Sequence, residues 1–301
     1  MSTYSIKDLE HLTGIKAHTI RIWEQRYDIL SPKRTDTNIR YYDSTDLKHM
    51  LNIALLNNNG YKISKIAKMS QEEVFEAVLQ TIDKNNNYSD QINALTVAMI
   101  DLNEAQFEKI MSTNILQIGF EDTMLNIIYP FLTKIGFLWQ IDSINPAQEH
   151  FMTNLIRQKL IVAIDGQFSY NSTFHQKYML YLPEGELHEI SLLFAAYLVK
   201  VRGNQATYLG QSLPMKDVYE AYKIHQPDFI LTVITSSPDI DHVQEYLYEL
   251  SEKFEDTQIL ISGYQVIGQD LDIPDNIVVI THFKYLVEFI EEQKQFQKKL
   301  N

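Results

Sequence analysis

Two acidic–histidine pairs in this sequence have residue types that suit metal or cofactor chemistry. Glu186 and His188 stand two residues apart in a polar, glycine-containing stretch, and Glu149 and His150 are adjacent. A neutral imidazole is a good metal ligand. A carboxylate that accepts a hydrogen bond from its second ring nitrogen fixes the tautomer and raises the basicity of the ligating nitrogen. Such pairs also occur on surfaces that bind nothing, so each has to be judged from the sequence around it.

The sequence around His188 predicts a ligand-binding position. The run His175 to Leu182 is apolar and of strand length, and residues 190–199 predict an apolar helix that ends at Gly203. A second short strand, Gln205 to Leu209, follows. Strand, helix and strand in this order predict a parallel sheet, whose ligands lie beyond the carboxyl ends of the strands. His188 falls at such an end.

The alternation of strands and helices continues to the C-terminus. The expected elements are Met215 to His225, Phe229 to Thr235, Asp241 to Glu255, Gln258 to Ser262, Ile277 to Thr281 and a last helix. We therefore expect a Rossmann-like α/β domain of about five strands over residues 173–301.

Residues 89–172 predict a four-helix bundle. Apolar residues recur at helical spacing in Ile92 to Leu102, Ala105 to Ile115, Phe120 to Trp139 and Pro146 to Ile164. Pro130 is expected to break or bend the third segment. Taken alone, Trp139 is more often a core residue and Glu149-His150 part of a polar helix face.

Residues 1–72 predict a winged helix-turn-helix. Ser5 can cap a first short helix, Thr13-Gly14 is a turn, and a second helix runs from Lys16 to about Tyr27. On the second helix one side is apolar and the other polar; the apolar side has Ile20, Trp23 and Tyr27, and the polar side has His18, Arg21 and Gln25. The stretches Ser31 to Arg34 and Ile39 to Tyr42 predict a two-stranded wing, after which Asp43 to Asp46 caps another helix.

The charges are divided unevenly along the chain. The net charge is −13, but residues 1–70 carry +4 and the remainder −17. A basic N-terminal part suits DNA, although a small helical interaction module with ordinary surface arginines has the same pattern. No long heptad run follows it, and residues 73–88, which include Asn85-Asn86-Asn87, are expected to be a linker.

The composition excludes several classes of protein. The chain has 301 residues, 45% of them hydrophobic, which is enough for two or three domains with cores of their own. It contains no cysteine, so disulfides, thiolate metal sites and cysteine nucleophiles are excluded. The N-terminus has no apolar region typical of a signal peptide, and no apolar run is as long as a membrane span. We expect a cytoplasmic protein.

The N-terminal motifs resemble the DNA-binding domain of the MerR family. The resemblance covers nearly all of residues 3–69, including YSIKDLEHLTGIKAHTIRIWEQRY, PKRT and IRYY. It implies that the helix with Thr19 and Arg21 enters the major groove of double-stranded operator DNA, while the wing contacts phosphates. The expected DNA-binding residues are Lys16, His18, Thr19, Arg21, Arg34, Arg40 and Tyr41.

The stretch from Glu186 to Pro214 resembles the cobalamin-binding domain family, with E-x-H followed by Y-L-G-Q-S-L-P. The resemblance implies that His188 is the lower axial ligand of cobalt and that Glu186 is its acidic partner. The later family serine aligns with Val233, and the neighbouring Thr232 or Thr235 is the alternative at that position; Gly263 matches the second glycine of the family's G-G pair. Residues Ser191, Val233 and Ser262 differ from the family pattern.

Trp139, followed after nine residues by Glu149-His150, resembles the helical cap of CarH/LitR-type regulators, which are cobalamin-dependent MerR-type photoreceptors. The resemblance implies that Trp139 covers the upper face of adenosylcobalamin and that Glu149 and His150 lie beside the adenosyl group. Light-sensing members that form a second histidine bond to cobalt have a histidine where this chain has Gln140.

These motifs together predict a transcriptional regulator, a repressor, and not an enzyme. We expect adenosylcobalamin to favour a homo-oligomer, a dimer or tetramer, that binds repeated operators, and light to break the cobalt–carbon bond and disassemble it. In the alternative, the chain is a MerR-type regulator that does not use cobalamin and is controlled by a protein partner or another ligand. A cobalamin-dependent mutase or methyltransferase subunit is a third interpretation, which the DNA-binding domain disfavours.

Overall fold

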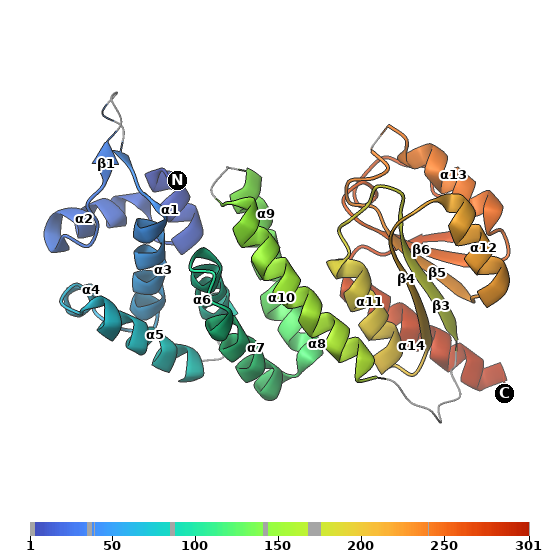
Figure 1. Cartoon of the computed structure of the whole chain (residues 1–301), viewed down its shortest axis with the longest axis horizontal. Coiled ribbons are helices and arrows are strands. Elements are labelled where there is room, and N and C mark those ends of the chain that lie inside the picture. Colours follow the sequence, from blue (N-terminus) through green and yellow to red (C-terminus); the bar gives the residue numbers. More distant parts are fainter. Residues whose placement is uncertain are drawn as a thin grey trace. The chain divides into compact units, whose positions relative to one another are not determined.

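The structure is a computed structural model that describes residues 4–34, 38, 40–84, 88–140, 144–167, 176–239 and 241–300. The chain divides into two compact units, unit 1 (Met1–Leu155) and unit 2 (Ile156–Asn301) (Figure 1). Helix α10 (Pro146–Asp165) begins in unit 1 and ends in unit 2. The expected boundaries at residues 72, 88 and 172 remain predictions.

Unit 1 begins with the expected winged helix-turn-helix. The elements are α1 (Ile6–Thr13), α2 (Ala17–Tyr27), β1 (Lys33–Arg34), β2 (Arg40–Tyr41), α3 (Ser44–Asn58) and α4 (Ile63–Ile66). Ser5 and Asp8 form a capping box at the start of α1, and Gly14 ends that helix in the left-handed conformation. These local contacts confirm the predicted cap and turn, which fix where α2 starts.

Most of the expected linker is a helix. Helix α5 (Gln71–Lys84) spans nearly all of residues 73–88, and Val74, Val78 and Thr81 on it are buried. Their spacing of four and three residues forms one face, which packs against α3. The polar residues around them conceal this face in the sequence, and the linker at residues 73–88 stays a prediction. The three asparagines at 85–87 lie outside the described residues.

The middle of the chain is helical, as expected. Its elements are α6 (Tyr88–Ile100), α7 (Glu104–Ile118), α8 (Phe120–Thr123), the π-helical turn η1 (Met124–Ile128), α9 (Tyr129–Gln140) and the first part of α10. Pro130 does not break the third segment, because it is the second residue of α9 and follows the wider π-helical turn. Helix α8, the turn η1 and α9 follow one another without a gap, and the π-helical turn interrupts the regular i to i−4 bonds just before the residue that has no N–H.

Three polar contacts join the N-terminal helices to the bundle inside unit 1. They connect Asn59 Nδ2 with Asp90 Oδ2 (2.5 Å), Lys48 Nζ with Asp101 Oδ1 (2.7 Å), and Lys134 Nζ with the Leu12 carbonyl (3.0 Å) and Asn93 Oδ1 (2.9 Å). Two of the acceptors are on α6 and a third, Asp101, follows it directly. The helix-turn-helix and the bundle therefore share one interior.

The Lys134 contact gives unit 1 a pH-dependent stability. Burial lowers the pKa of the Lys134 ammonium from 10.5 to about 8, so between these values the unfolded chain binds more protons than the folded one and stability rises with pH. Relative to Lys134→Met, the wild type should gain about 1–2 kcal/mol in free energy of unfolding from pH 8 to 9.5.

This gain can be measured by urea unfolding followed by tryptophan fluorescence, because both tryptophans, Trp23 and Trp139, lie in unit 1. Lys7→Met, at an exposed position of the same unit, is the control. The prediction is contradicted if the free energy of unfolding of the wild type exceeds that of Lys134→Met by the same amount throughout this pH range.

Unit 2 is the expected Rossmann-like α/β domain. Its strands are β3 (Lys177–Pro183), β4 (Gln205–Leu213), β5 (Phe229–Val233), β6 (Gln258–Ser262) and β7 (Ile277–Val279), and the helices are α11 (Ile190–Val201), α12 (Met215–His225), α13 (Val243–Lys253) and α14 (Phe283–Leu300). All described pairs are parallel, in the order β4-β3-β5-β6-β7. This order places the topological switch point between β3 and β5.

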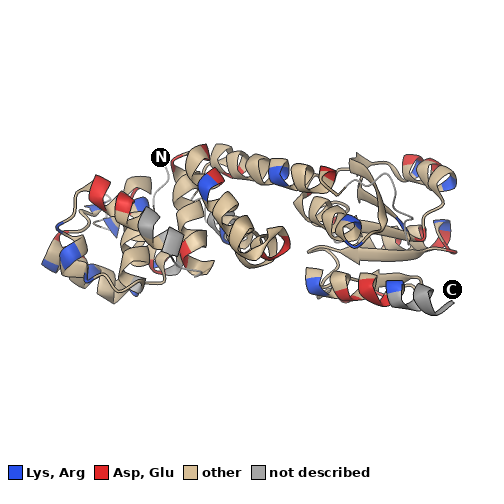
Figure 2. Ribbon diagram, turned by 90° about the horizontal axis from the view of Figure 1, so that it is seen from below, with Lys and Arg blue, Asp and Glu red and all other residues tan. Residues whose placement is uncertain are grey.

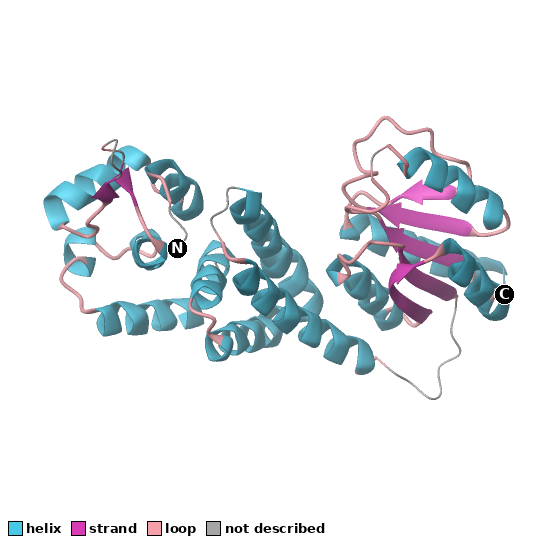
Figure 3. Ribbon diagram, turned by 45° about the horizontal axis from the view of Figure 1, so that its top comes forward, coloured by secondary structure: helices cyan, strands magenta, loops and turns pink. Residues whose placement is uncertain are grey.

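Two layers of helices cover the sheet (Figures 1 and 3). Helices α12 and α13 bury Val218, Val243 and Leu247 against one face. Helices α11 and α14 cover the other, where Phe194 packs edge-on against Phe283. Helix α11 is buried along nearly its whole length, as its composition predicts, and it therefore fixes the loop that precedes it.

None of the described helices is long and apolar enough to cross a membrane.

Candidate functional site

Glu186 is the centre of a hydrogen-bond cluster at the carboxyl end of β3. Its side chain is fully buried. Its two oxygens accept hydrogen bonds from five backbone N–H groups, those of Leu187 (2.9 Å), His188 (3.0 Å), Thr235 (2.8 Å), Ser236 (2.6 Å) and Ser237 (3.2 Å). The last three follow β5, so this carboxylate joins the loops after β3 and β5 at the topological switch point.

The environment of Glu186 keeps it ionised. Burial alone would raise the pKa of this carboxyl, but the hydrogen bonds from the His188 ring and from the backbone of Ser236, His188 and Ser237 lower it well below its usual value. Glu186 is therefore a fixed negative charge and accepts hydrogen bonds only.

His188 has the geometry of an oriented metal ligand. Its Nδ1 lies 2.6 Å from Glu186 Oε1, while the side chain is 62% exposed. In the neutral ring this contact places the proton on Nδ1 and the lone pair on Nε2, the nitrogen on the other side of the ring. The structure thus brings the predicted pair together. Nδ1 of His188 contacts the Glu186 carboxylate, and most of the ring is exposed.

Gly263 holds the loop after β5 in place. Its φ is +112°, and a Cβ on this residue would lie 2.2 Å from the Ile234 carbonyl oxygen. Only glycine permits this close approach of two backbones. Gly263 therefore acts on the site through the segment that leads to Thr235–Ser237.

Thr232 and Val233 point away from the surface. Both belong to β5 and are buried, Thr232 completely. The hydroxyl of Ser262, another position that differs from the family pattern, donates to the Ile280 carbonyl at 2.7 Å. The residues that contact Glu186 lie instead in the loop after β5 and are Thr235, Ser236 and Ser237. Sequence reasoning noted only Thr235 among them, because the contacts span about fifty residues of chain.

The second pair lies in the first turns of α10. His150 Nδ1 is 2.7 Å from Glu149 Oε2, with the histidine 71% and the glutamate 26% exposed. The structure thus brings this pair together as well. Trp139 lies in the last turn of α9, and its side chain is outside the described residues.

Helix α2 has the predicted two faces. Ile20 and Trp23 are buried, and His18 and Arg21 are exposed. Thr19 is half-buried. Lys16, just before the helix, is 81% exposed, and its Nζ lies 2.9 Å from Glu10 Oε1.

The wing pairs β1 with β2 in antiparallel register, with Lys33 opposite Tyr41 and Arg34 opposite Arg40. Arg34 Nη1 donates to Asn38 Oδ1 at 2.8 Å. Behind the wing, the Tyr42 hydroxyl donates to Glu24 on α2 at 2.5 Å. This contact fixes the wing and α2 relative to each other.

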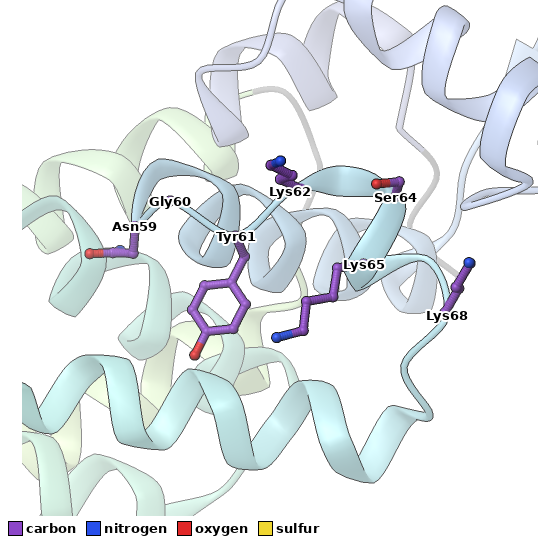
Figure 4. Close-up of a pocket in the computed structure, with 7 residues that line it drawn as sticks. All are labelled: Asn59, Gly60, Tyr61, Lys62, Ser64, Lys65 and Lys68. Atoms are coloured by element: carbon purple, nitrogen blue, oxygen red, sulfur yellow. The ribbon is translucent and has the colours of Figure 1, made fainter.

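A basic pocket that sequence reasoning missed lies around α4. It has a volume of about 500 Å³ and is lined by Asn59, Gly60, Tyr61, Lys62, Ser64, Lys65 and Lys68. Figure 4 shows Lys65 extending beside the Tyr61 ring, with Nζ 5.7 Å from the ring centroid. Several lysines around one hollow suit an anion such as a phosphate. Figure 2 shows Lys and Arg positions gathered at this end of unit 1.

The donors around His188 are too few for a bare metal ion. Within the described part of the chain no group of three or more His, Cys, Asp or Glu side chains could hold one. A single histidine instead suits a metal already held by a macrocycle, to which it adds one axial bond. The residues present therefore fit a corrinoid.

Family comparisons match the N-terminal helix-turn-helix and the helical middle of the chain, but do not extend to Glu186 and His188. Residues 4–73 match the MerR HTH family of regulatory proteins, and residues 91–163 match the B12 binding domain family. The chain thus has an N-terminal HTH domain of the MerR type, followed by a segment of the B12 binding domain family. The B12-binding domain implies a corrinoid cofactor.

Two curated relatives from Myxococcus xanthus extend the similarity along the chain. The HTH-type transcriptional repressor CarH is 25% identical over 260 residues, which cover 83% of this chain and 85% of CarH. The HTH-type transcriptional repressor CarA is 25% identical over 232 residues, which cover 76% of this chain and 75% of CarA.

A solved structure shares the fold. The monomethylamine corrinoid protein of Methanosarcina barkeri superimposes with a TM-score of 0.51 at 13% identity, covering 65% of this chain and 94% of that protein. The similarity shows the fold alone.

Proposed function

We propose that this chain is a repressor whose binding to operator DNA is controlled by adenosylcobalamin and by light. The observation that carries the proposal is the Glu186–His188 pair, held at the switch point of a Rossmann-like sheet in a chain with a B12-binding domain. Both relatives that match most of the chain are named repressors. As a DNA-binding regulator it is expected in the cytoplasm.

In this proposal His188 is the lower axial ligand of cobalt. Glu186 holds the Nδ1 proton, which leaves Nε2 as the ligating atom and raises its basicity. Ser236 Oγ, 3.4 Å from the same Nδ1, limits rotation of the ring. Gly263 keeps the Ser236 loop close to Glu186, and Thr232 keeps that loop anchored in the sheet core.

The cap residues would act on the opposite side of the cofactor. Trp139 would exclude water from the upper face of the cofactor. His150 contacts one carboxylate oxygen of Glu149, and the other oxygen would accept a hydrogen bond from the adenosyl group. When bound, adenosylcobalamin supplies a cobalt–carbon bond that light can break. Gln140 follows Trp139, so we expect this chain to respond to light without a second histidine bond from that position.

The test is a visible absorption spectrum of the full-length protein after incubation with adenosylcobalamin in the dark and desalting. Retained colour supports the cofactor. Illumination with green light should then change both the spectrum and the elution volume on gel filtration. If the elution volume stays the same after a complete spectral change, light does not change the oligomeric state, and this part of the proposal is wrong.

A colourless wild type after desalting would favour the alternative, a MerR-type regulator controlled by a protein partner or another ligand. One observation supports that alternative: the side chain of Ser191, half-buried in the first turn of α11, stands where the cobalamin-binding pattern has glycine.

We propose that α2 and the wing form the DNA interface. The exposed face of α2, with His18, Thr19 and Arg21, would enter the major groove. Lys16, Arg34, Arg40 and Tyr41 would contact phosphates, and the basic pocket around α4 would bind a further phosphate. A homo-oligomer of this chain, a dimer or tetramer, would require operator half-sites about 34 Å apart or a multiple of that spacing.

Arg40→Ala should weaken binding to all DNA sequences alike, because a phosphate contact carries no sequence information. The slope of log affinity against log salt should become shallower by about 0.9 for each phosphate that the variant no longer neutralises. Fluorescence anisotropy with operator and scrambled duplexes at several salt concentrations measures both quantities.

Arg21→Ala is the matched comparison, since it removes an arginine from the face expected to contact bases. It should reduce the preference for operator over scrambled DNA by about 1–3 kcal/mol. Equal salt slopes for Arg40→Ala and wild type would remove Arg40 from the phosphate contacts.

A further inference from the structure

A second buried carboxylate lies directly beside the His188 ligand and faces the other way. Glu189 is 8% exposed and is the residue before α11. Its Oε1 accepts a hydrogen bond from Arg157 Nε, and its Oε2 accepts one from the Tyr208 hydroxyl at 2.7 Å. Whereas Glu186 binds the His188 ring itself, Glu189 binds neither the ring nor the β5 loop in the described contacts.

The partners of Glu189 come from two different elements. Arg157 belongs to the part of α10 that lies in unit 2, and Tyr208 lies in β4. A buried carboxylate is costly unless it is paired and hydrogen-bonded, so these contacts hold the residue after His188 in one position. The loop that carries His188 is thereby fixed at its second end.

Strand β4 supports the rest of this loop. Gln211 Nε2 donates to the Leu187 carbonyl at 2.7 Å, and Ser212 Oγ accepts from the Gly185 N–H at 3.0 Å. With Tyr208, three residues of β4 contact three residues of the loop. Glu186 holds the loop from the β5 side, and β4 and α10 hold it from the opposite side.

We propose that Arg157, Glu189 and Tyr208 form a positioning network that sets the place of the His188 ring for axial ligation. The inference rests on the proposed function, because it concerns the same histidine. It also assigns a role to α10, which is continuous from Glu149 and His150 to Arg157. A shift of this helix along its axis would move the anchor of the ligand loop.

The test uses Glu189→Gln and Tyr208→Phe in the full-length protein. Glutamine has almost the shape of glutamate, but its NH₂ group cannot accept from Arg157 or Tyr208, so one of these two hydrogen bonds cannot form. Phenylalanine removes only the hydroxyl. Glu291→Gln is the control. Glu291, in the middle of α14, also pairs with an arginine of unit 2, Arg202 (3.4 Å), and lies outside the loop of His188.

Two quantities are measured for each variant. One is the dissociation constant for adenosylcobalamin in the dark. The other is the electron paramagnetic resonance spectrum with cob(II)inamide, a corrinoid that lacks the nucleotide base, so that only an axial nitrogen from the protein splits each cobalt line into a triplet. The second readout reports the histidine bond itself, which a loss of general stability does not change while the protein stays folded.

We expect Glu189→Gln to weaken binding about tenfold and to reduce the fraction of protein that shows the nitrogen triplet, as for other outer partners of metal ligands. Tyr208→Phe should have a smaller effect in the same direction. The control should match wild type in both measurements. This pattern supports the network.

The network and the proposed function fail in different ways. Suppose that the wild type binds cobalamin and shows a clear nitrogen triplet. If Glu189→Gln and Tyr208→Phe then have the same triplet and the same affinity, the network is overturned and His188 remains the ligand. A wild type that binds no cobalamin overturns both. Should Glu189→Gln not fold, Tyr208→Phe decides the question, since it leaves the Arg157–Glu189 ion pair in place.

Discussion

Glu186→Ala is expected to lower the free energy of unfolding of unit 2 by about 3–4 kcal/mol. The substitution removes the acceptor of five backbone N–H groups and of the His188 ring. Donors that are left without a partner cost more than the same hydrogen bonds contribute when they are made. The loops after β3 and β5 would then lose the group that joins them.

Hydrogen exchange of the amides in β3 and β5 measures this effect, because it reports the free energy of opening of unit 2 alone. Glu184→Ala is the control, since Glu184 is exposed and lies two residues before Glu186 in the same loop. Glu186→Gln should be intermediate, because the amide retains one accepting oxygen. An effect of Glu186→Ala no larger than that of Glu184→Ala would contradict the assigned role.

The local signals in the sequence were sufficient for the elements and for the ligand pair. Ser5 with Asp8 and the Thr13-Gly14 turn determine α1, and the apolar run before Arg202-Gly203 determines the buried helix α11. Glu186 and His188 are two residues apart, so their contact is a property of one short loop. Such features depend on neighbours in the chain, which a single sequence displays.

Contacts between distant segments were not predictable in the same way. Thr235 and Ser236 reach Glu186 only because β5 lies next to β3 in the sheet, and the sequence does not give the strand order. Lys62, Lys65 and Lys68 recur every three residues, a spacing that equally suits a solvated helix face. Their common pocket depends on how α4 packs in unit 1.

A packed helix face is hard to see in the sequence where the composition is polar. The asparagines at 85–87 predict a linker, while Val74, Val78 and Thr81 before them have helical spacing. These three apolar or small positions are a weak signal against many charged neighbours. Packing against α3 supplies the stability that this helix lacks by itself.

His188→Ala is expected to weaken adenosylcobalamin binding by about 100-fold or more, while leaving the apo protein as stable as wild type. The loss of a ligating residue should cost at least as much as the loss of its outer partners, for which about 10- to 100-fold is typical. Stability should change little, because the His188 side chain is 62% exposed and Glu186 retains its backbone donors. The opposite pattern is expected for Glu186→Ala, which acts first on folding.

The structure offers a matched control in the same unit. His242 is 66% exposed, and its Nδ1 lies 2.7 Å from Asp239 Oδ1, so it reproduces the histidine–carboxylate contact without the buried carboxylate. Equilibrium titration with adenosylcobalamin in the dark should give wild-type affinity for His242→Ala and the large loss for His188→Ala. Equal affinities of the two variants for adenosylcobalamin would contradict the role of His188, and another residue would have to be the ligand. The expected difference arises because Glu186, unlike Asp239, is a buried charge that fixes its loop and orients the histidine ring.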